Sequence, residues 1–296
     1  MSHGAWIILI GALVASSCGF VGCFLILRKM AMLGDAISHA ILPGIVLAFL
    51  ISQSMDGIIM LAGATVVGLL TALFIQTLHN SGVQSDAAIG VTFTALFSIG
   101  VVLVSLFTSK VHLDLQHVLY GEIAYAPWEL ITLAGIEMPR AVWMMGGVFI
   151  LTLLLIGVFY KEIKLASFDP QLATALGIPV LWLHYLLMGL VSMNTVAAFE
   201  SVGAILVVAM LVIPGATAFL LTDRLSSMLL LSIFLGTLAS FGGYFLAVLW
   251  DVSISGSITV FSLLLFILSF FFSPRQGVIS KWLSYKRLQS EHTIKQ

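Results

Sequence analysis

The sequence predicts an all-α polytopic membrane protein with about nine transmembrane helices. Of its 296 residues, 60% are hydrophobic and 8% are charged, and the mean hydropathy is +1.16. Soluble domains carry about 25% charged residues, so this composition indicates a chain embedded in lipid. The apolar residues fall into runs of about 20, the length that an α-helix needs to cross a bilayer. The net charge of −1 gives no indication of a nucleic-acid partner, and none is predicted.

The apolar runs give the expected helices in order along the chain. They lie near residues 5–27, 31–52, 57–78, 87–108, 142–160, 183–200, 203–222, 226–249 and 256–273. The first two runs, and also the sixth and seventh, are nearly continuous, so eight helices is the alternative count. No Lys or Arg precedes the first run, and it extends to Leu27, so we interpret it as a retained span and not as a signal peptide.

The basic residues in the loops predict the orientation, because loops rich in Lys and Arg remain in the cytoplasm. With the N-terminus outside, only Lys110 and Arg140 fall in an external loop. The cations that then fall inside are Arg28, Lys29, Lys161, Lys164, Arg224, Arg275, Lys281, Lys286, Arg287 and Lys295. The C-terminus is therefore predicted to be cytoplasmic. Residues 1–275 are expected to form a single transmembrane domain, and residues 276–296 a basic cytoplasmic tail.

Asp35 and His39 stand out because they are ionisable residues near the middle of an apolar run. Their i, i+4 spacing places both on one face of the second predicted helix. An Asp in hydrocarbon costs several kcal/mol, so this face should meet protein or an aqueous cavity. Pro43 and Gly44 follow one turn later and are expected to interrupt the helix, as in the broken helices of transporters.

Two interpretations of Asp35 and His39 remain open from the residues alone. The pair could be hydrogen-bonded and lock two helices together. Alternatively it could ligate a metal ion, because a carboxylate oxygen and an imidazole nitrogen suit Mn²⁺, Zn²⁺ or Fe²⁺. Two ligands are too few for a site, but a symmetric dimer would supply two Asp and two His around one axis.

Five segments resemble the metal-ion permeases of bacterial ATP-binding cassette importers, the manganese, zinc and iron group. They are GDAISHAILPGIVLAFL (34–50), HVLYGEI (117–123), LASFDPQLATALGI (165–178), AFESVGAILVVAMLVIPGATAFLLTDRL (198–225) and SISGSITV (253–260). The resemblance covers nearly the whole chain and implies a fold related to the larger vitamin B12 and siderophore permeases. The run 198–225 looks most like the manganese members.

The resemblance implies a role and a set of partners. Asp35 and His39 would line the translocation path and contact the ion, with no tightly bound cofactor. The chain would be a multi-pass permease subunit in a bacterial plasma membrane. It would pair with a second permease subunit, identical or related, and with cytoplasmic ATPase subunits, and an external or periplasmic metal-binding protein would deliver the ion.

The loop 161–182 is a candidate contact with the ATPase, since the chain contains no GxxxxGK[ST] phosphate-binding loop of its own. Asp169 is a favourable N-cap, Pro170 suits the first helical position, and Gly177 suits the end of a helix. These residues predict a short helix over 170–176. It is expected to present Leu172, Ala173 and Leu176 on the cytoplasmic side, and the resemblance makes it the coupling helix.

Two weaker groups of polar residues complete the candidate sites. His112, Asp114 and His117 lie close together in the long external loop and could bind a cation there, although a solvated loop is the simpler interpretation. Glu200 and Asn194 lie toward the outer end of the sixth predicted span. They could form a gate or a proton-sensitive pair, or Glu200 could be an interfacial carboxylate.

The sequence fits two functions from other classes less well. An intramembrane zinc enzyme using Asp35 and His39 would need a third ligand and a general base, and the sequence contains neither HExxH nor GxSxG. A passive cation channel would be expected to carry rings of acidic residues and to need no cytoplasmic docking helix. Both are less favoured than the transport subunit.

Overall fold

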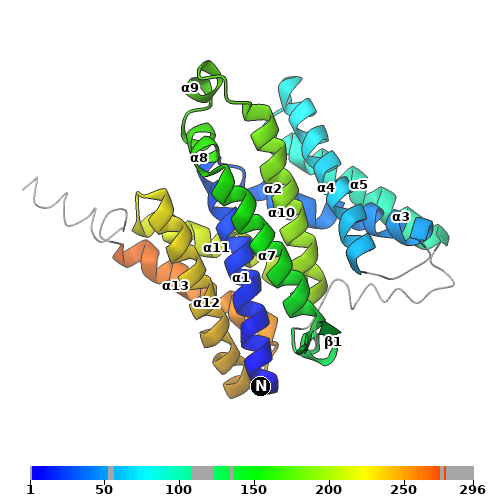
Figure 1. The fold of residues 1–296 in the computed structure, drawn as a ribbon, viewed down its shortest axis with the longest axis vertical. Coiled ribbons are helices and arrows are strands. Elements are labelled where there is room, and N and C mark those ends of the chain that lie inside the picture. The colour runs from blue at the N-terminus through cyan, green and yellow to red at the C-terminus, as the bar shows by residue number, and fades with distance from the viewer. Residues whose placement is uncertain (1, 53–56, 108–122, 134–135, 274–276, 278–296) are drawn as a thin grey trace, which may run out of the picture.

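The computed structural model describes residues 2–52, 57–107, 123–133, 136–273 and 277, and these are almost entirely helical (Figure 1). Nine helical segments of the described chain are long and apolar enough to cross a membrane. The predicted fold class and the count of nine are therefore confirmed. Of the predicted basic tail, only Gly277 falls within the described residues.

The elements follow the predicted spans closely, with several additions. The helices are α1 (His3–Leu27), α2 (Ala31–Ala40), α3 (Leu42–Ser52), α4 (Gly57–Asn80), α5 (Ser85–Phe107), α7 (Arg140–Val158), α8 (Tyr160–Phe168), α9 (Pro170–Ala175), α10 (Val180–Val202), α11 (Ala204–Leu221), α12 (Leu225–Trp250) and α13 (Ile254–Phe272). A 3₁₀ turn, η1 (Ala126–Trp128), precedes the strands β1 (Leu130–Leu133) and β2 (Ile136–Pro139).

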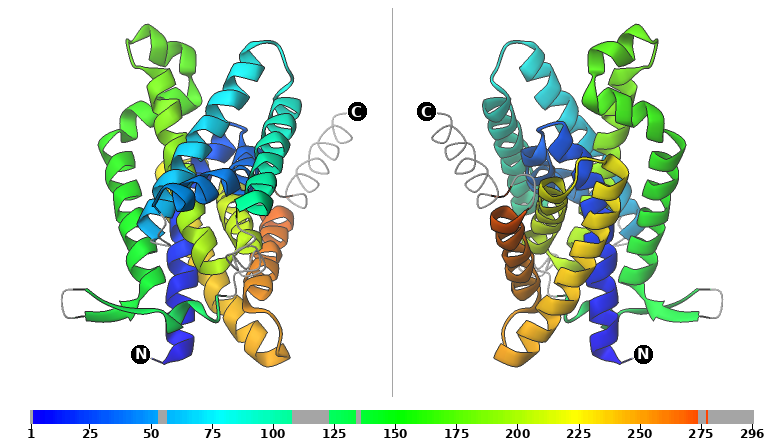
Figure 2. Two further views of the ribbon diagram at one scale, coloured as in Figure 1. Left: turned by 90° about the vertical axis from the view of Figure 1, so that its right-hand side faces the viewer. Right: turned by 90° about the vertical axis from the view of Figure 1, so that its left-hand side faces the viewer.

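The helix α1 lies at the centre of the larger of two helix groups (Figures 1 and 2). It packs against α7, α10, α11 and α12, and α13 covers α11 and α12 from outside. The smaller group consists of α2 to α5, and α10 joins the groups because it also contacts α2 and α4. The strands β1 and β2 and the N-terminus lie at one end of the molecule, whereas α9 lies at the other (Figure 1).

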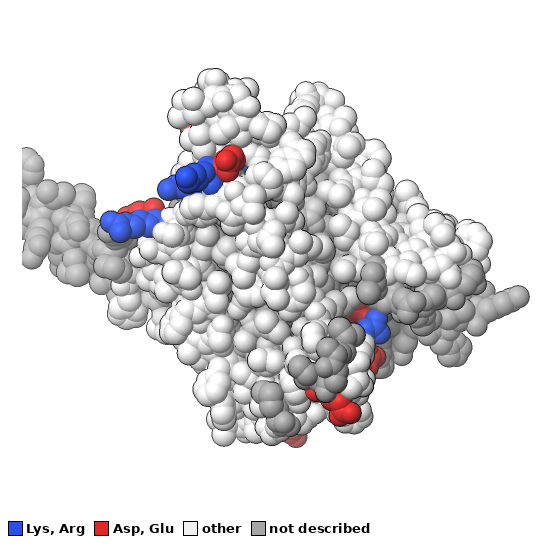
Figure 3. All heavy atoms as spheres, viewed as in Figure 1, with Lys and Arg blue, Asp and Glu red and all other residues white. Residues whose placement is uncertain are grey.

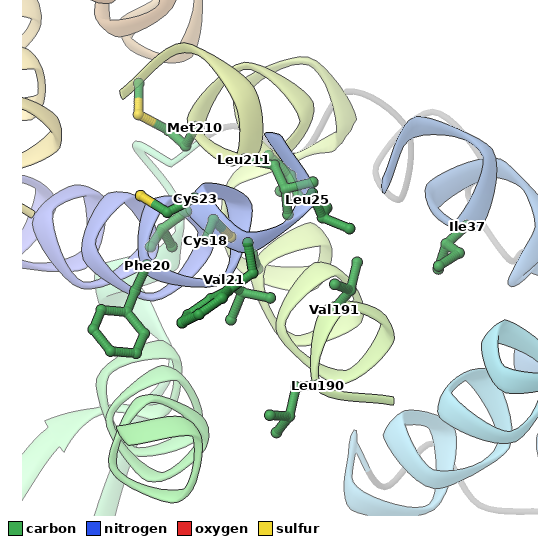
Figure 4. Packing of buried hydrophobic residues seen from close by; sticks show 14 of the residues in the cluster. Cys18, Phe20, Val21, Cys23, Leu25, Ile37, Leu190, Val191, Met210 and Leu211 are labelled. Carbon is green, nitrogen blue, oxygen red and sulfur yellow. The ribbon is translucent and has the colours of Figure 1, made fainter. Parts of the chain in front are cut away.

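Small residues of α1 allow the neighbouring helices to approach closely. Cys18 and Cys23 are buried free thiols in the core that α1 forms with α10 and α11 (Figure 4). A Cβ atom at Gly22 would lie 1.7 Å from the carbonyl oxygen of Leu211 on α11. Because lipid supplies no hydrophobic drive between helices, such close contact is what stabilises their association.

The second predicted span is divided at Ile41 into α2 and α3. Pro43 explains the division, because proline has no N–H to donate to the carbonyl of His39 and its ring crowds that carbonyl. Ile41 itself remains helical, with φ −72° and ψ −16°. The two helices nevertheless form one span of 22 residues, Ala31–Ser52, with a local break at Ile41.

The polar segments between spans contain structure that the sequence pattern did not indicate. The segment predicted to be the long external loop includes the antiparallel hairpin of β1 and β2, in which Ile131 pairs with Met138 and Thr132 with Glu137. On the opposite end, the helix α8 precedes the predicted short helix and turns the chain toward it. Both features lie outside the apolar spans, where hydropathy carries no information about local structure.

Candidate functional site

The face of α2 that carries Asp35 and His39 is open on one side. The Nε2 atom of His39 lies 3.6 Å from Oδ1 of Asp35. Their side chains remain 37% and 47% exposed, respectively, whereas Ala36 and Ile37 between them are buried. The pair therefore points away from the core of its own chain. In hydrocarbon this exposure would be costly, so a second protein surface or a water-lined path should face the pair.

Two aromatic residues of α5 flank the imidazole. The ring centroid of His39 lies 6.1 Å from that of Phe93 and 6.2 Å from that of Phe97. They restrict the ring orientation and leave its nitrogen edge beside Asp35. Among the described residues no group of three or more His, Cys, Asp or Glu side chains could hold a metal ion. One chain thus offers Asp35 and His39 as two ligands, and further ligands must come from another molecule or from water.

The break after His39 is held in place by neighbouring helices. Pro43 and Gly44 are both buried. A Cβ atom at Gly44 would lie 2.6 Å from the carbonyl oxygen of Gly63 on α4, and one at Gly100 on α5 would lie 2.8 Å from Cδ of Pro43. The backbone is therefore clamped between α4 and α5. Pro43 has no N–H to donate to the carbonyl of His39, so the helical hydrogen-bond pattern is interrupted directly after the pair.

The short helix α9 has the ends that the sequence predicted. Oδ1 of Asp169 accepts a hydrogen bond from the backbone N–H of Leu172 at 2.9 Å. At the other end Gly177 has φ +79°, a conformation that favours glycine. The N–H of Ile178 donates to the carbonyl of Ala173, and that of Gly177 to the carbonyl of Thr174, which is the Schellman arrangement. The helix is thus closed at both ends by local bonds.

The exposed face of α9 is smaller than expected. Leu172 is 47% exposed and Leu176 is 65% exposed, as predicted. Ala173, expected on the same face, is buried, which corrects that prediction. Its Cβ points toward the protein because α9 folds back against α8 and α10. The two leucines are therefore the large apolar side chains exposed on α9, and Ala173 packs beneath them.

Glu200 and Asn194 belong to separate polar groups. Oε1 of Glu200 pairs with Nη2 of Arg140 at 3.0 Å, and Nη1 of Arg140 lies 3.6 Å from Oε2 of Glu129. These ion pairs connect the first residue of α7, next to the hairpin, to α10. The sequence identifies Arg140 only as a loop cation, because nothing in the pattern indicates which carboxylate it would meet.

Asn194 instead joins three helices inside the bundle. The hydroxyl of Ser17 on α1 donates to Oδ1 of Asn194, and Nδ2 donates to Oγ1 of Thr152 on α7 at 2.9 Å and to the carbonyl of Leu190 at 2.7 Å. All of its polar atoms are thus used in a fully buried position. The structure supports a packing role for Asn194 and does not bring it to Glu200. The candidate external residues His112, Asp114 and His117 lie outside the described residues.

Comparison with known proteins identifies the family. The model of the ABC 3 transport family matches residues 5–273, almost the full length of the chain. The chain belongs to the ABC 3 transport family. The resemblance inferred from the five segments is confirmed. Membership gives the chain a transport role rather than a catalytic one and makes it a multi-pass membrane protein.

Relatives within the ABC 3 transport family align over nearly all of the chain. The manganese transport system membrane protein MntD of Bacillus subtilis is 56% identical over 292 residues, which is 98% of this chain and 99% of the relative. The zinc transport system membrane protein TroD of Treponema pallidum is 42% identical over 284 residues, 96% of this chain and 77% of the relative.

A solved structure shares the same fold. PsaBC from Streptococcus pneumoniae, determined in complex with a Fab, superposes with a TM-score of 0.79 at 38% identity. The match covers 97% of this chain and 96% of that chain. The helical arrangement described above is thus that of an ABC 3 transport family protein.

Proposed function

We propose that the chain is the permease subunit of an ATP-driven importer of a divalent transition metal, most favourably Mn²⁺, and that the ion passes Asp35 and His39. The half-exposed pair on a broken transmembrane helix carries this proposal. Its ligand types suit such an ion, and it faces outward with an incomplete coordination shell. The relatives named for manganese and zinc support these two ions as the main candidates.

A second permease subunit, identical or related, would complete the coordination shell. A two-fold axis beside α2 would bring two Asp and two His side chains together, which makes four ligands. The surface around the pair is suited to burial, since Met32, Leu47 and Ile51 on α2 and α3 are exposed apolar residues. The ion would then be bound between subunits, at a site that either chain alone lacks.

The two ends of the molecule would meet different partners. The cations of the described chain gather toward the end that carries α8 and α9, apart from Arg140 beside the hairpin (Figure 3). By the positive-inside rule this end would be cytoplasmic, with the N-terminus and the hairpin outside and the C-terminus inside. The ATPase subunits would dock on α9, and a metal-binding protein would deliver the ion at the hairpin end.

Uptake into vesicles tests the proposed function. The vesicles carry this subunit with its ATPase and metal-binding protein, and uptake of radioactive Mn²⁺ is measured with and without ATP. We expect radioactive Mn²⁺ to accumulate only when ATP is present. Unlabelled Mn²⁺ should inhibit this uptake more strongly than the same concentration of Zn²⁺. Equal flux without ATP, or without the ATPase subunits, would indicate a channel. Stronger competition by Zn²⁺ would reassign the substrate to zinc.

Substitutions on α9 test the docking surface. In Leu172→Asp and Leu176→Asp a charge replaces an exposed apolar side chain. If these leucines are central contacts, each loss should weaken binding by about 2 kcal/mol, or about 30-fold in affinity. The measurement is recovery of the ATPase subunit with the purified permease.

The matched control is Ser81→Asp, which adds the same charge at an exposed position between α4 and α5 on the same end of the molecule. It should retain the ATPase. Normal ATPase recovery with both leucine variants would show that α9 is an incidental loop helix.

A further inference from the structure

Arg28 forms a hydrogen bond between two segments that are remote in sequence. Its Nε donates to Oγ of Ser167 at 3.1 Å, across 139 residues of sequence. Arg28 lies in the turn between α1 and α2, whereas Ser167 is the last but one residue of α8. Among the described residues no other side-chain hydrogen bond joins α8 or α9 to a membrane-spanning helix or its turns.

On one side, Arg28 is fixed to the helix that carries the metal ligands. The turn is closed by backbone bonds from Arg28 to Phe24, from Lys29 to Ile26 and from Met30 to Leu25, at 3.0 to 3.1 Å for the first two and 2.8 Å for the third. The next bond, from Leu33 to Met30, is the first of α2. Asp35 follows within the second turn of that helix. A displacement of Arg28 therefore moves the start of α2 with it.

On the other side, Ser167 is fixed to the proposed ATPase contact. Its hydroxyl donates to the carbonyl of Ile163 at 2.7 Å, which holds the side chain against α8. The N–H of Asp169 donates to the carbonyl of Leu165, and Asp169 then caps α9. Phe168 alone separates Ser167 from this cap. Because Asp169 both ends α8 and caps α9, and the two helices pack against each other, we expect α8 and α9 to move as one unit.

The surroundings of Arg28 make this contact unusual for a surface cation. Burial lowers the pKa of its guanidinium to about 10, which leaves it protonated at neutral pH. Its Nη2 atom is buried and has no hydrogen-bond partner among the described residues. A buried donor without a hydrogen-bond partner destabilises the fold. An arginine in this position therefore calls for another explanation, such as a role in function. A donor without a partner is also available to form a new bond when α8 moves.

We propose that Arg28 is a positioning residue that transmits movement of the α8 and α9 segment to α2, and thereby to Asp35 and His39. The inference rests on the proposed docking of the ATPase on α9. Arg28 touches neither the ion path nor the exposed face of α9. Its loss should therefore separate ATP hydrolysis from transport without removing either partner.

The test measures Mn²⁺ uptake and ATP hydrolysis in the same vesicles, with the complete transporter reconstituted. For Arg28→Met we expect the ions taken up per ATP hydrolysed to fall about tenfold, the effect of losing one bond to a charged group, while ATPase recovery is unchanged. Ser167→Ala should give the same defect, and the double variant should be no worse than Arg28→Met alone. Ser167→Thr, which keeps the hydroxyl, should take up as many ions per ATP hydrolysed as the unaltered protein.

The control is Arg224→Met, which removes an exposed arginine at the start of α12 on the same end of the molecule. It should leave the uptake per ATP unchanged. Normal coupling in Ser167→Ala and Arg28→Met would overturn the inference. If Arg28→Met does not assemble, Ser167→Ala decides alone. A failure of the docking proposal is distinguishable, because the leucine variants of α9 would then retain the ATPase.

Discussion

Uptake of Mn²⁺ is expected to be lost in both Asp35→Ala and His39→Ala. Each substitution removes one of the two proposed ligands of a chain, and in the proposed symmetric dimer it would remove two of four. Removing even a group that supports a metal ligand lowers affinity about 10- to 100-fold, so uptake should fall by at least about 100-fold. The measurement is ATP-dependent uptake into vesicles, with ATP hydrolysis and subunit recovery recorded for the same preparations.

The matched controls are Asp86→Ala and His79→Ala, which remove exposed residues of the same types near the ends of α5 and α4. These should transport normally. Normal uptake by the Asp35 and His39 variants would show that the pair is a device for packing helices. If the variants lose subunit recovery as well as uptake, the pair has a structural role. Asp35→Asn, which keeps the shape and hydrogen bonding of the side chain, would then separate this structural role from ion binding.

A second large effect is expected at Gly22, where α1 meets α11. A side chain there would collide with the backbone of Leu211, which cannot move as a flexible side chain could. Overpacking usually lowers the free energy of unfolding by about 1–3 kcal/mol. Because the collision is with backbone, we expect Gly22→Val to lose at least the upper value of this range. We expect little monodisperse protein by size-exclusion chromatography in detergent and a lower thermal unfolding temperature.

The control for Gly22→Val is Gly146→Val on α7, where an added Cβ meets nothing within 4 Å. It should purify like the unaltered protein. If Gly22→Val is recovered in equal yield and with equal thermal stability, the close approach of α1 and α11 is not needed for the fold.

Hydropathy was sufficient to predict the number and positions of the candidate spans, because crossing lipid imposes a single strong requirement on each span. The first predicted span, 5–27, and the fourth, 87–108, differ from α1 and α5 by two residues or fewer at each end. The near-fusion of the sixth and seventh spans is resolved at Gly203, whose φ of +81° ends α10. The hairpin and α8 were missed, since no lipid constrains them.

The candidate site divides in the same way between local and long-range features. The i, i+4 spacing of Asp35 and His39, the effect of Pro43 and the capping of α9 by Asp169 follow from residues within one or two turns. The bonds from Arg28 to Ser167 and from Arg140 to Glu200 join distant segments, and a single sequence does not indicate which partner each cation meets. The burial of Ala173 likewise depends on how α9 folds back.

The odd number of spans constrains how two such subunits can be joined. The nine candidate spans of the described chain, each crossing the bilayer once, would put His3, where α1 begins, and Phe272, where α13 ends, on opposite faces. Two copies in the same orientation therefore cannot be linked end to end by a soluble connector, because the second copy must begin on the face opposite to the end of the first. A single-chain pair would require an additional membrane-crossing linker. With nine crossings, the proposed pair would therefore be assembled from two separate polypeptides.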